Sequence, residues 1–442
     1  MATILIIGTA LLGLYMAWNI GANDVANSMA DAVGSKSLSV RQAVIAAGLC
    51  NFAGAVLVGG HVTDTVRKGI VNPCTIAGSL NVSEAEAAAV VAIGMAAALL
   101  SAGIWLNFSS LLGMPVSTTH AIVGGVAGFG IVAGGWSVVN WGKMGQIVAS
   151  WFISPVAGCV CAFIVFKLLG RFVLWRKQPV RAARYGVPVI VFFVTAVVTL
   201  ATLYKGLKHV AGESVLFTGL GASLTSLGLG ALLALGSAVL VRRYLRGKDS
   251  RPVGEQLGIV ERAFAPVVAA TSCTVAFAHG ANDVANSVGP LAAVVHMLQA
   301  GTVIMKVAVP FWVLALGGAG IVIGLATYGY RVMYTVGRRI TQLTPSRGVA
   351  ADIAGTLVIL ICCRLKLPVS TTHTLVGAIF GVGLARGLGA VNKGVMRNIF
   401  GSWIITVPAA AVLSILLFLA GRWILLDLFT QAVRSSAGTF QP

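Results

Sequence analysis

Acidic residues are scarce in this chain. Only 12 of its 442 residues are Asp or Glu, against 31 Lys and Arg, and charged residues make up 10% of the sequence. A soluble domain of ordinary composition carries about 25% charged residues, so this composition argues against a soluble globular protein. The sequence also lacks a Walker-type glycine-rich loop, a G-x-S-x-G elbow and a zinc-ligand motif. It therefore gives no sign of a nucleotide-driven pump or of a common hydrolase.

Cysteine is present, but in no pattern that carries chemistry. The chain has 7 cysteines and no C-x-x-C spacing, and several of them lie in apolar runs. Cysteine in such surroundings behaves as a small hydrophobic residue. We therefore expect no disulfide framework, no cysteine-bound metal and no cofactor.

Apolar residues dominate the sequence. Hydrophobic residues make up 57% of the chain, and the mean hydropathy is +0.93. Stretches such as Val187–Tyr204 and Ala409–Ala420 are long enough, with their flanks, to cross a hydrocarbon core of about 30 Å. The first apolar stretch, Ala2–Tyr15, has no basic flank and no cleavage site, so we expect a retained helix. The sequence predicts an all-α polytopic membrane protein.

The chain has a net charge of +19, and its basic residues lie between the apolar stretches. One basic loop runs over Arg171–Arg184 and another over Arg242–Arg251. The positive-inside rule explains such loops better than nucleic-acid binding does, and it predicts that both are cytoplasmic. We expect an integral protein of a prokaryotic cytoplasmic membrane, with the N-terminus outside, the lipid bilayer as a partner and no nucleic acid.

Three motifs occur twice, in the same order. The octapeptide Gly-Ala-Asn-Asp-Val-Ala-Asn-Ser comes first, Pro-Val-Ser-Thr-Thr-His second, and a Ser-Trp pair third. Their positions are Gly21–Ser28 and Gly280–Ser287, Pro115–His120 and Pro368–His373, Ser150-Trp151 and Ser402-Trp403. Motifs that recur in a fixed order indicate a duplicated unit.

The duplication divides the chain into three parts. We expect a first transmembrane repeat at 1–170, a two-helix insert with basic cytoplasmic loops at 171–262, and a second repeat at 263–442. Because the insert begins and ends on the cytoplasmic side, two repeats that each cross an odd number of times have opposite orientation. Inverted-topology repeats are typical of secondary transporters. Parallel repeats stay open as an alternative if one repeat holds an extra re-entrant segment.

Each octapeptide places an acid and two amides inside apolar sequence. Asp24 and Asp283 occupy the same place in the two copies, and ionisable groups at membrane depth are costly and usually functional. Amide and carboxylate oxygens suit Na⁺ or a proton relay better than a soft metal, although asparagines also join helices by hydrogen bonds. The interrupted apolar run indicates that the helix breaks here. Non-helical backbone at membrane depth must line a cavity. The candidate sodium ligands are Asn23, Asp24, Asn27, Asn282, Asp283 and Asn286.

The Pro-Val-Ser-Thr-Thr-His motif predicts the start of a helix. Proline suits a first helical position, and Ser or Thr hydroxyls satisfy first-turn N–H groups. At membrane depth such a helix terminus forms an anion site, although an ordinary capped helix has the same sequence. Together with the two aspartates, the candidate anion ligands are Ser117, Thr118, Thr119, Ser370, Thr371 and Thr372.

Paired cation-type and anion-type clusters describe an anion–cation symporter. Phosphate near pH 7 keeps a proton that it can donate to Asp24 or Asp283, whereas sulfate does not. We predict secondary active import of inorganic phosphate with Na⁺ or H⁺ through an alternating-access site between the repeats. A sulfate or other oxyanion permease, an anion channel and a membrane-embedded hydrolase remain as alternatives. The hydrolase would use Ser117 or Ser370 with His120 or His373.

These motifs resemble those of the inorganic phosphate transporter (PiT) family. The resemblance rests on the doubled motifs, extends through Arg41–Asn51, Thr65–Gly69 and Leu343–Ser346, and misses the insert. It implies cation-coupled phosphate uptake, inverted repeats, about 12 transmembrane helices with broken or re-entrant segments, and a substrate site at the repeat interface. It carries the family's motif residues onto Asn23, Asp24, Asn27, Ser117, Thr118, Thr119, Asn282, Asp283, Asn286, Ser370, Thr371 and Thr372.

The chain departs from the sodium-coupled branch of that family at two acids. That branch carries glutamate where this chain has Asn51 and Met95, and the corresponding acid of the second half is shortened to Asp352. Asn51 and Asp352 are therefore further candidates for cation binding or coupling. The lost carboxylates favour proton coupling, although the Asn51 carbonyl oxygen can still bind Na⁺.

Three histidines adjoin the motifs. His120 and His373 could carry protons, but we favour a role as packed helix residues because no acid is near them in sequence. His279 precedes the second octapeptide, where Ile20 precedes the first, so it is a weaker or an asymmetric candidate. A homodimer is a further expectation that no motif supports.

Overall fold

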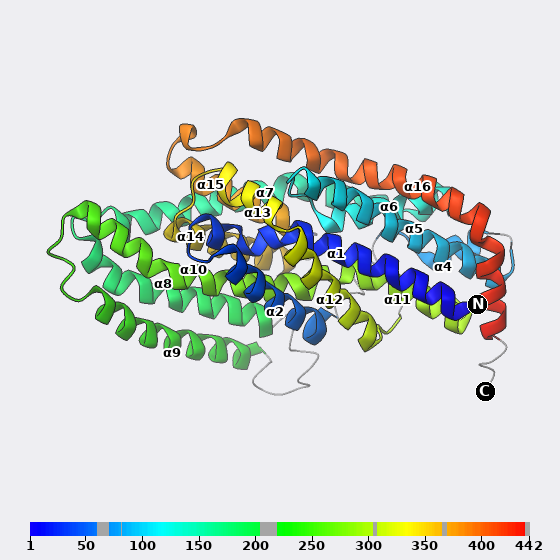
Figure 1. The fold of residues 1–442 in the computed structure, drawn as a ribbon, viewed down its shortest axis with the longest axis horizontal. Helices are drawn as coiled ribbons and strands as arrows, with labels where there is room; N and C mark the ends of the chain where they lie inside the picture. The colour runs from blue at the N-terminus through cyan, green and yellow to red at the C-terminus, as the bar shows by residue number, and fades with distance from the viewer. Residues whose placement is uncertain (60–69, 81, 204–218, 304–306, 365–368, 438–442) are drawn as a thin grey trace.

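The computed structural model describes residues 1–442 apart from 60–69, 81, 204–218, 304–306, 365–368 and 438–442 (Figure 1). The described residues are helical, with an isolated bridge between Val71 and Val139 outside the helices. In chain order the α-helices are α1 (Ala2–Gly34), α2 (Val40–Val58), α4 (Pro73–Ser79), α5 (Glu84–Leu111), α6 (Thr118–Gly134), α7 (Trp141–Leu169), α8 (Pro179–Thr202), α9 (Gly219–Leu245), α10 (Val253–Asp283), α11 (Ala285–Ala300), α12 (Phe311–Thr327), α13 (Tyr330–Tyr334), α14 (Pro345–Arg364), α15 (Thr371–Ala385) and α16 (Lys393–Ala437). Short 3₁₀ turns lie at η2 (Trp136–Val138) and η7 (Leu388–Ala390), and π-helical turns at η3 (Gly170–Leu174) and η6 (Thr335–Arg339).

Many of these helices can cross a membrane. Within the described residues, 9 helices are long and apolar enough to do so, or up to 10 if the pair α12 and α13–η6, bent by 57°, is one span. Two further apolar helices, α6 and α15, are shorter, with 17 and 15 residues. The prediction of an all-helical polytopic membrane protein is confirmed at this level.

The two octapeptides differ in backbone. The first lies inside α1, which runs without interruption from Ala2 to Gly34, so the expected helix break at Gly21–Ser28 is wrong. The second is interrupted at Val284, between the end of α10 and the start of α11. In the first copy the polar side chains bond to neighbouring segments and leave the backbone hydrogen bonds of α1 in place, so the helix has no need to break.

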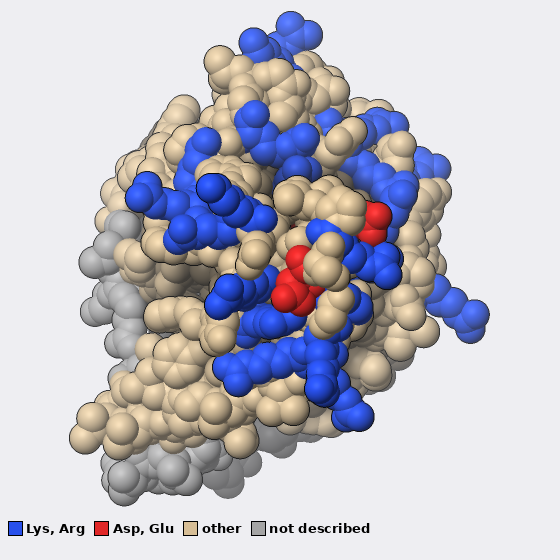
Figure 2. Space-filling model, turned by 90° about the vertical axis from the view of Figure 1, so that its left-hand side faces the viewer, with Lys and Arg blue, Asp and Glu red and all other residues tan. Residues whose placement is uncertain are grey.

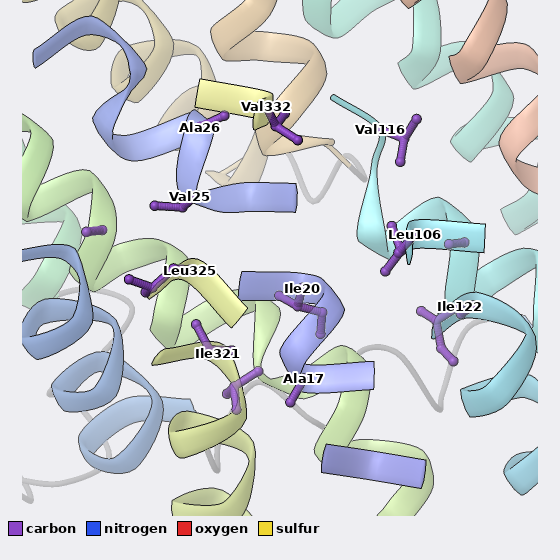
Figure 3. Close-up of a cluster of buried hydrophobic side chains, with 14 of the residues drawn as sticks. Ala17, Ile20, Val25, Ala26, Leu106, Val116, Ile122, Ile321, Leu325 and Val332 are labelled. Atoms are coloured by element: carbon purple, nitrogen blue, oxygen red, sulfur yellow. The ribbon is translucent and has the colours of Figure 1, made fainter. Parts of the chain in front are cut away.

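Helix α1 runs through the middle of the molecule. Figure 3 shows Ile321 and Leu325 of α12 on one side of it, and Leu106 of α5 and Ile122 of α6 on the other. Contact with α12 is close because it is made by glycine. A Cβ added to Gly21 would stand 2.0 Å from the Ile321 carbonyl oxygen. Small residues allow such backbone approach where lipid removes the hydrophobic driving force.

The helix contacts come in matched pairs. Helix α1 packs on α12 and α5, and α10 packs on α2 and α14. In the same way α6 packs on α16, and α15 packs on α7. The contacts of α1, α5, α6, α12 and α16 in this list thus have parallels in those of α10, α14, α15, α2 and α7.

Basic side chains gather at one end of the molecule. The start of α1 and the end of α16 lie at one end of the long axis, on the right of Figure 1, and the α7–α8 and α9–α10 connections lie at the other. Figure 2 shows the face at that other end, where Lys and Arg side chains are abundant and acidic ones few. Helices α8 and α9 of the insert pack on each other, and α8 also packs on α10.

Candidate functional site

Both Ser-Thr-Thr motifs begin helices inside the protein. Ser117 caps α6, and its Oγ accepts a hydrogen bond from the His120 N–H at 3.3 Å. Ser370 caps α15 in the same way, accepting from the His373 N–H at 3.3 Å. The predicted helix starts are confirmed, and both caps are buried. Pro368, which opens the second motif, lies outside the described residues.

Asn23 holds the segment that leads into α6. Its Nδ2 donates to the Ser110 Oγ and to the Met114 carbonyl oxygen, both at 3.0 Å. Its Oδ1 accepts from the Val116 N–H at 3.0 Å. Three of its hydrogen-bonding positions are occupied within the protein, so this asparagine positions the first Ser-Thr-Thr motif against α1.

Asp24 joins the two halves of the chain. Its Oδ2 accepts from the Thr118 hydroxyl at 2.8 Å, and its Oδ1 faces the Thr372 hydroxyl at 3.1 Å. The Asn27 Nδ2 lies 3.0 Å from Asp24 Oδ1 and 2.8 Å from Thr372 Oγ1. Asp24 is fully buried. One carboxylate of the first octapeptide therefore contacts the Ser-Thr-Thr motifs of both halves.

The second octapeptide reaches back to the first half. The Asn286 Nδ2 lies 3.3 Å from Thr118 Oγ1 and 3.1 Å from Thr119 Oγ1. This contact is the counterpart of Asn27 with Thr372. Each octapeptide thus bonds to the helix start of the other half, and the duplicated motifs meet at one buried place.

Asp283 accepts hydrogen bonds from fewer side chains than Asp24 does. Its Oδ1 accepts from the Asn282 Nδ2 at 2.9 Å, and its Oδ2 lies 3.5 Å from the Thr371 hydroxyl. Asp283 is buried, whereas Asn282 and Thr371 are partly exposed.

His279 stands between the two aspartates. Its Nε2 lies 3.0 Å from Asp283 Oδ2 and 3.3 Å from Asp24 Oδ2. Its Nδ1 lies 2.7 Å from the Asn51 Oδ1. Ligand atoms of the three titratable residues all lie within 4.8 Å of one another, and all three residues are buried. Within the described chain, His279 is thus the basic residue that Asp24 and Asp283 share as a neighbour.

Asn51 belongs to this group, but Asp352 does not. Asn51 lies on α2 and also donates to the Ala47 carbonyl oxygen at 2.8 Å. Asp352 lies on α14, accepts a short hydrogen bond from Thr271 of α10, and faces the carboxyl of Asp31. The two residues proposed for coupling from the sequence therefore sit in different clusters.

Asp31 was missed in the sequence. It is buried on α1, and its Oδ1 accepts from the Ser272 hydroxyl at 3.1 Å and from the Ala32 N–H at 2.8 Å. It follows Asp24 by two helical turns on the same helix, a spacing that places both acids on one side of α1. That spacing was the available signal.

His120 and His373 pack together, away from the acids. Their rings meet edge to face with centroids 4.8 Å apart. His373 stacks on Trp403 at 3.8 Å, and His120 lies 5.5 Å from Trp151. The tryptophans of the Ser-Trp pairs thus pack on the histidines of their own halves. This geometry agrees with packed helix residues better than with proton carriers.

Comparison with known proteins identifies the chain. A family model described as the phosphate transporter family matches residues 20–414, which include both octapeptides and both Ser-Thr-Thr motifs. The chain belongs to this family. Membership sets it among transporters and not among enzymes, which removes the hydrolase alternative.

Relatives and a solved structure agree with this assignment across nearly the whole chain. A protein of Thermococcus kodakarensis with the provisional name phosphate permease is 46% identical over 415 residues, 93% of this chain and 96% of the relative. The chloroplastic inorganic phosphate transporter 2-1 of Arabidopsis thaliana is 42% identical over 422 residues, 92% of this chain and 70% of the relative. A solved structure described as the sodium-dependent phosphate transporter matches with a TM-score of 0.79 and 38% identity, covering 95% of this chain and 100% of its own.

Proposed function

We propose that this phosphate transporter works as a symporter, which imports inorganic phosphate together with a cation. The observation that carries the proposal is the meeting of both duplicated motif pairs at Asp24. Thr118 and Thr372, from different halves, both contact this one buried carboxylate. A site assembled from two halves can open to either side as the halves move, which is the requirement of alternating access.

The phosphate ligands in this proposal are the hydroxyls and first-turn N–H groups of α6 and α15. Helix N-termini favour anions through their free N–H groups and dipoles. A phosphate hydroxyl would donate to Asp24 or Asp283, and sulfate has no such proton near neutral pH. Sulfate and other oxyanions are therefore poorer substrates in this proposal. The ligands are Ser117, Thr118, Thr119, Ser370, Thr371, Thr372, Asp24 and Asp283.

The coupling ion binds beside the phosphate, at the oxygens of the octapeptides and Asn51. Sodium is supported by the solved relative that is described as sodium-dependent and by the clustered amide and carboxylate oxygens. Proton coupling is supported by His279, whose Nε2 lies within 3.3 Å of both aspartates, and by Asn51 and Met95 standing where sodium-coupled relatives carry acids. The residues proposed for the ion are Asn23, Asn27, Asn282, Asn286 and Asn51 with the two aspartates, and Asp352 in a separate coupling role.

The repeats are proposed to be inverted, at 1–170 and 263–442 around the insert 171–262. The matched helix contacts support this division, since α1 with α12 corresponds to α10 with α2. The short helices α6 and α15 each start at a buried serine cap, which fits helices that begin at membrane depth. With them counted as returning half-spans, the repeats and insert amount to about twelve membrane segments.

The orientation follows from the charge asymmetry. The end of the molecule that carries the α7–α8 and α9–α10 connections is rich in Lys and Arg (Figure 2), and such ends stay in the cytoplasm. The start of α1 lies at the opposite end (Figure 1), so the N-terminus is proposed to be outside. We infer a prokaryotic cytoplasmic membrane, and a homodimer stays a prediction.

Uptake into proteoliposomes tests the function directly. Radiolabelled phosphate is offered with an inward Na⁺ gradient in one set, an inward proton gradient in another and no gradient in a third. Accumulation above equilibrium with one gradient identifies both the symport and its ion. Sulfate in excess should leave this uptake nearly unchanged. Equilibration without accumulation under both gradients would show a channel, and strong inhibition by sulfate would show an oxyanion permease of wider specificity.

A further inference from the structure

A cavity lies outside the candidate transport site. It has a volume of about 520 Å³ and is formed where the ends of α1 and α5, the start of α2 and the bent segment α13–η6 meet. Gly113, just before the first Ser-Thr-Thr motif, lines it, but none of the proposed phosphate or cation ligands does. The cavity is therefore separate from that site, although it adjoins the segment that leads into α6.

The cavity is lined by cationic side chains. Arg331, Arg338 and Arg339 line it, and no Asp or Glu is among its described lining residues. Arg331 is fixed in place, because its Nη1 donates to the Leu111 carbonyl oxygen at 3.2 Å and its Nε to the Tyr330 hydroxyl at 3.2 Å. It thereby ties α13 to the last turn of α5.

Arg338 and Arg339 are free to bind an anion. Both are exposed, and within the described part of the chain neither forms an ion pair with an acid. Their guanidinium carbons lie 5.8 Å and 5.2 Å from the centre of the Tyr334 ring. Two neighbouring guanidinium groups that both lie near one aromatic ring offer paired N–H donors, which suit bidentate hydrogen bonds to a phosphate group.

Apolar side chains also line the cavity. Val40, Leu111 and Leu112 line it with exposed fractions of 45%, 42% and 52%. An inorganic phosphate ion would fill a small part of a cavity of this size, which falls in the range of sites for larger organic ligands. The combination of guanidinium groups and apolar side chains fits a molecule that has both a phosphate group and a hydrocarbon body.

We propose that this cavity binds an anionic phospholipid. The phosphate of the headgroup lies against Arg338 and Arg339, and an acyl chain runs along Leu111 and Leu112. Basic pockets between transmembrane helices on the cytoplasmic side bind anionic headgroups, and the basic end of this molecule is the cytoplasmic one in the orientation proposed above.

A lipid in this cavity would join three parts of the fold. The π-helical turn η6 already touches the end of α1, where a Cβ on Gly34 would stand 2.3 Å from the Gly337 carbonyl oxygen. Arg331 connects the same segment to α5. A lipid bound to η6, α2 and α5 together would stabilise the folded protein and keep the loop before α6 in position.

Thermal unfolding of the delipidated protein in detergent tests the proposal. Phosphate is kept saturating throughout, so that the transport site stays filled. Added phosphatidylglycerol should raise the melting temperature by at least a few degrees, and phosphatidylcholine should not. In the Arg338→Ala/Arg339→Ala variant this shift should fall to the level of phosphatidylcholine. The Arg242→Ala/Arg243→Ala variant removes the same charge from the end of α9 and should keep the shift.

Two further arms separate a lipid from a soluble phosphate compound and guard against a folding defect. Glycerol phosphate, which has the headgroup chemistry without acyl chains, should give no shift; a shift as large as that of phosphatidylglycerol would overturn the lipid in favour of a soluble ligand. Leu112→Asp, which keeps both arginines and adds a negative charge among the apolar lining residues, should also abolish the shift.

Equal stabilisation by both lipids, or loss of the shift in the α9 variant, would refute the site. Mass spectrometry of the purified wild type should find retained phosphatidylglycerol that both cavity variants lack.

Discussion

Asp24 connects the two halves of the proposed site through hydrogen bonds. It contacts Thr118, Thr372 and Asn27, and an asparagine in its place keeps the shape but loses the charge. We expect Asp24→Asn to reduce gradient-driven phosphate uptake to the level of empty vesicles. The rearranged hydrogen bonds should cost about 1–3 kcal/mol of stability, so the variant should still purify as folded protein.

Asp283→Asn should have the same effect on uptake with a smaller loss of stability, because Asp283 accepts hydrogen bonds from fewer side chains. Asp427→Asn on the exposed surface of α16 is the control that changes the same charge elsewhere. Both activities are measured as initial uptake rates, and stability as the melting temperature. Uptake at the wild-type rate in either site variant would remove that aspartate from the transport mechanism.

Asp31 and Asp352 form a contact between two buried carboxyls. Substitutions at the two positions should change the melting temperature in different directions. In Asp31→Asn the new amide can donate to Asp352, while its oxygen still accepts from Ala32 and Ser272. We expect a melting temperature equal to or above that of the wild type. Asp352→Leu should lower it, since Thr271 and Asp31 lose a partner. Destabilisation of equal size in both variants would show that the pair is not held by this contact.

Most of the residues that the sequence singled out occur twice. Repetition makes Asp24 and Asp283, or Thr118 and Thr371, recognisable, because each has a counterpart in the other half. Asp31 has none, since Pro290 stands at its place after the second octapeptide, and His279 has Ile20. A repeat-based analysis overlooks Asp31 and ranks His279 as a weaker candidate. Their roles come from contacts between helices far apart in the chain, which no local pattern contains.

At the scale of helices, glycine sets how closely α1 and α12 approach. A Cβ on Gly21 would stand 2.0 Å from a backbone oxygen of Ile321, whereas Gly8, on the same helix, has nothing within 4 Å. Gly21→Ala must push the two helices apart, and overpacking of this kind costs about 1–3 kcal/mol or more. Gly8→Ala should leave stability unchanged or raise it slightly, because alanine is the better helix former.

Melting temperatures of the two variants in detergent check this prediction, with phosphate uptake as a second measurement. Because Gly21 begins the first octapeptide, its substitution should also disturb the site and reduce uptake. Equal stability of Gly21→Ala and Gly8→Ala would mean that α1 and α12 adjust without strain.

The sequence predicted the helix starts correctly where the chemistry is local. The caps at Ser117 and Ser370 follow from the preference of serine for the first turn. The break expected in the first octapeptide was wrong, because Asn23 and Asp24 find their partners on α5, α6 and α15. Those partners exist only in the folded protein, so the sequence could not show that α1 would stay continuous.

At the scale of the whole molecule, the uneven distribution of charge makes a prediction about orientation. Helix α7 runs from Trp141 to Leu169, a length of about 43 Å at 1.5 Å per residue, so Lys143 and the α7–α8 connection lie on opposite sides of the membrane. The α9–α10 connection, with Lys248, lies at the same end as the α7–α8 connection (Figure 1). The positive-inside rule predicts that this end stays in the cytoplasm.

Single cysteines introduced into a variant without native cysteines can test this orientation. A membrane-impermeant thiol reagent added to intact cells should label Lys143→Cys, and should label Lys248→Cys only after the membrane is opened. The reverse pattern would place the N-terminus inside and would invert the direction of every step proposed above. It would also move the phospholipid cavity to the outer leaflet, where the anionic surface potential of the cytoplasmic leaflet is absent. One labelling experiment therefore tests the proposed topology and the setting of the lipid site together.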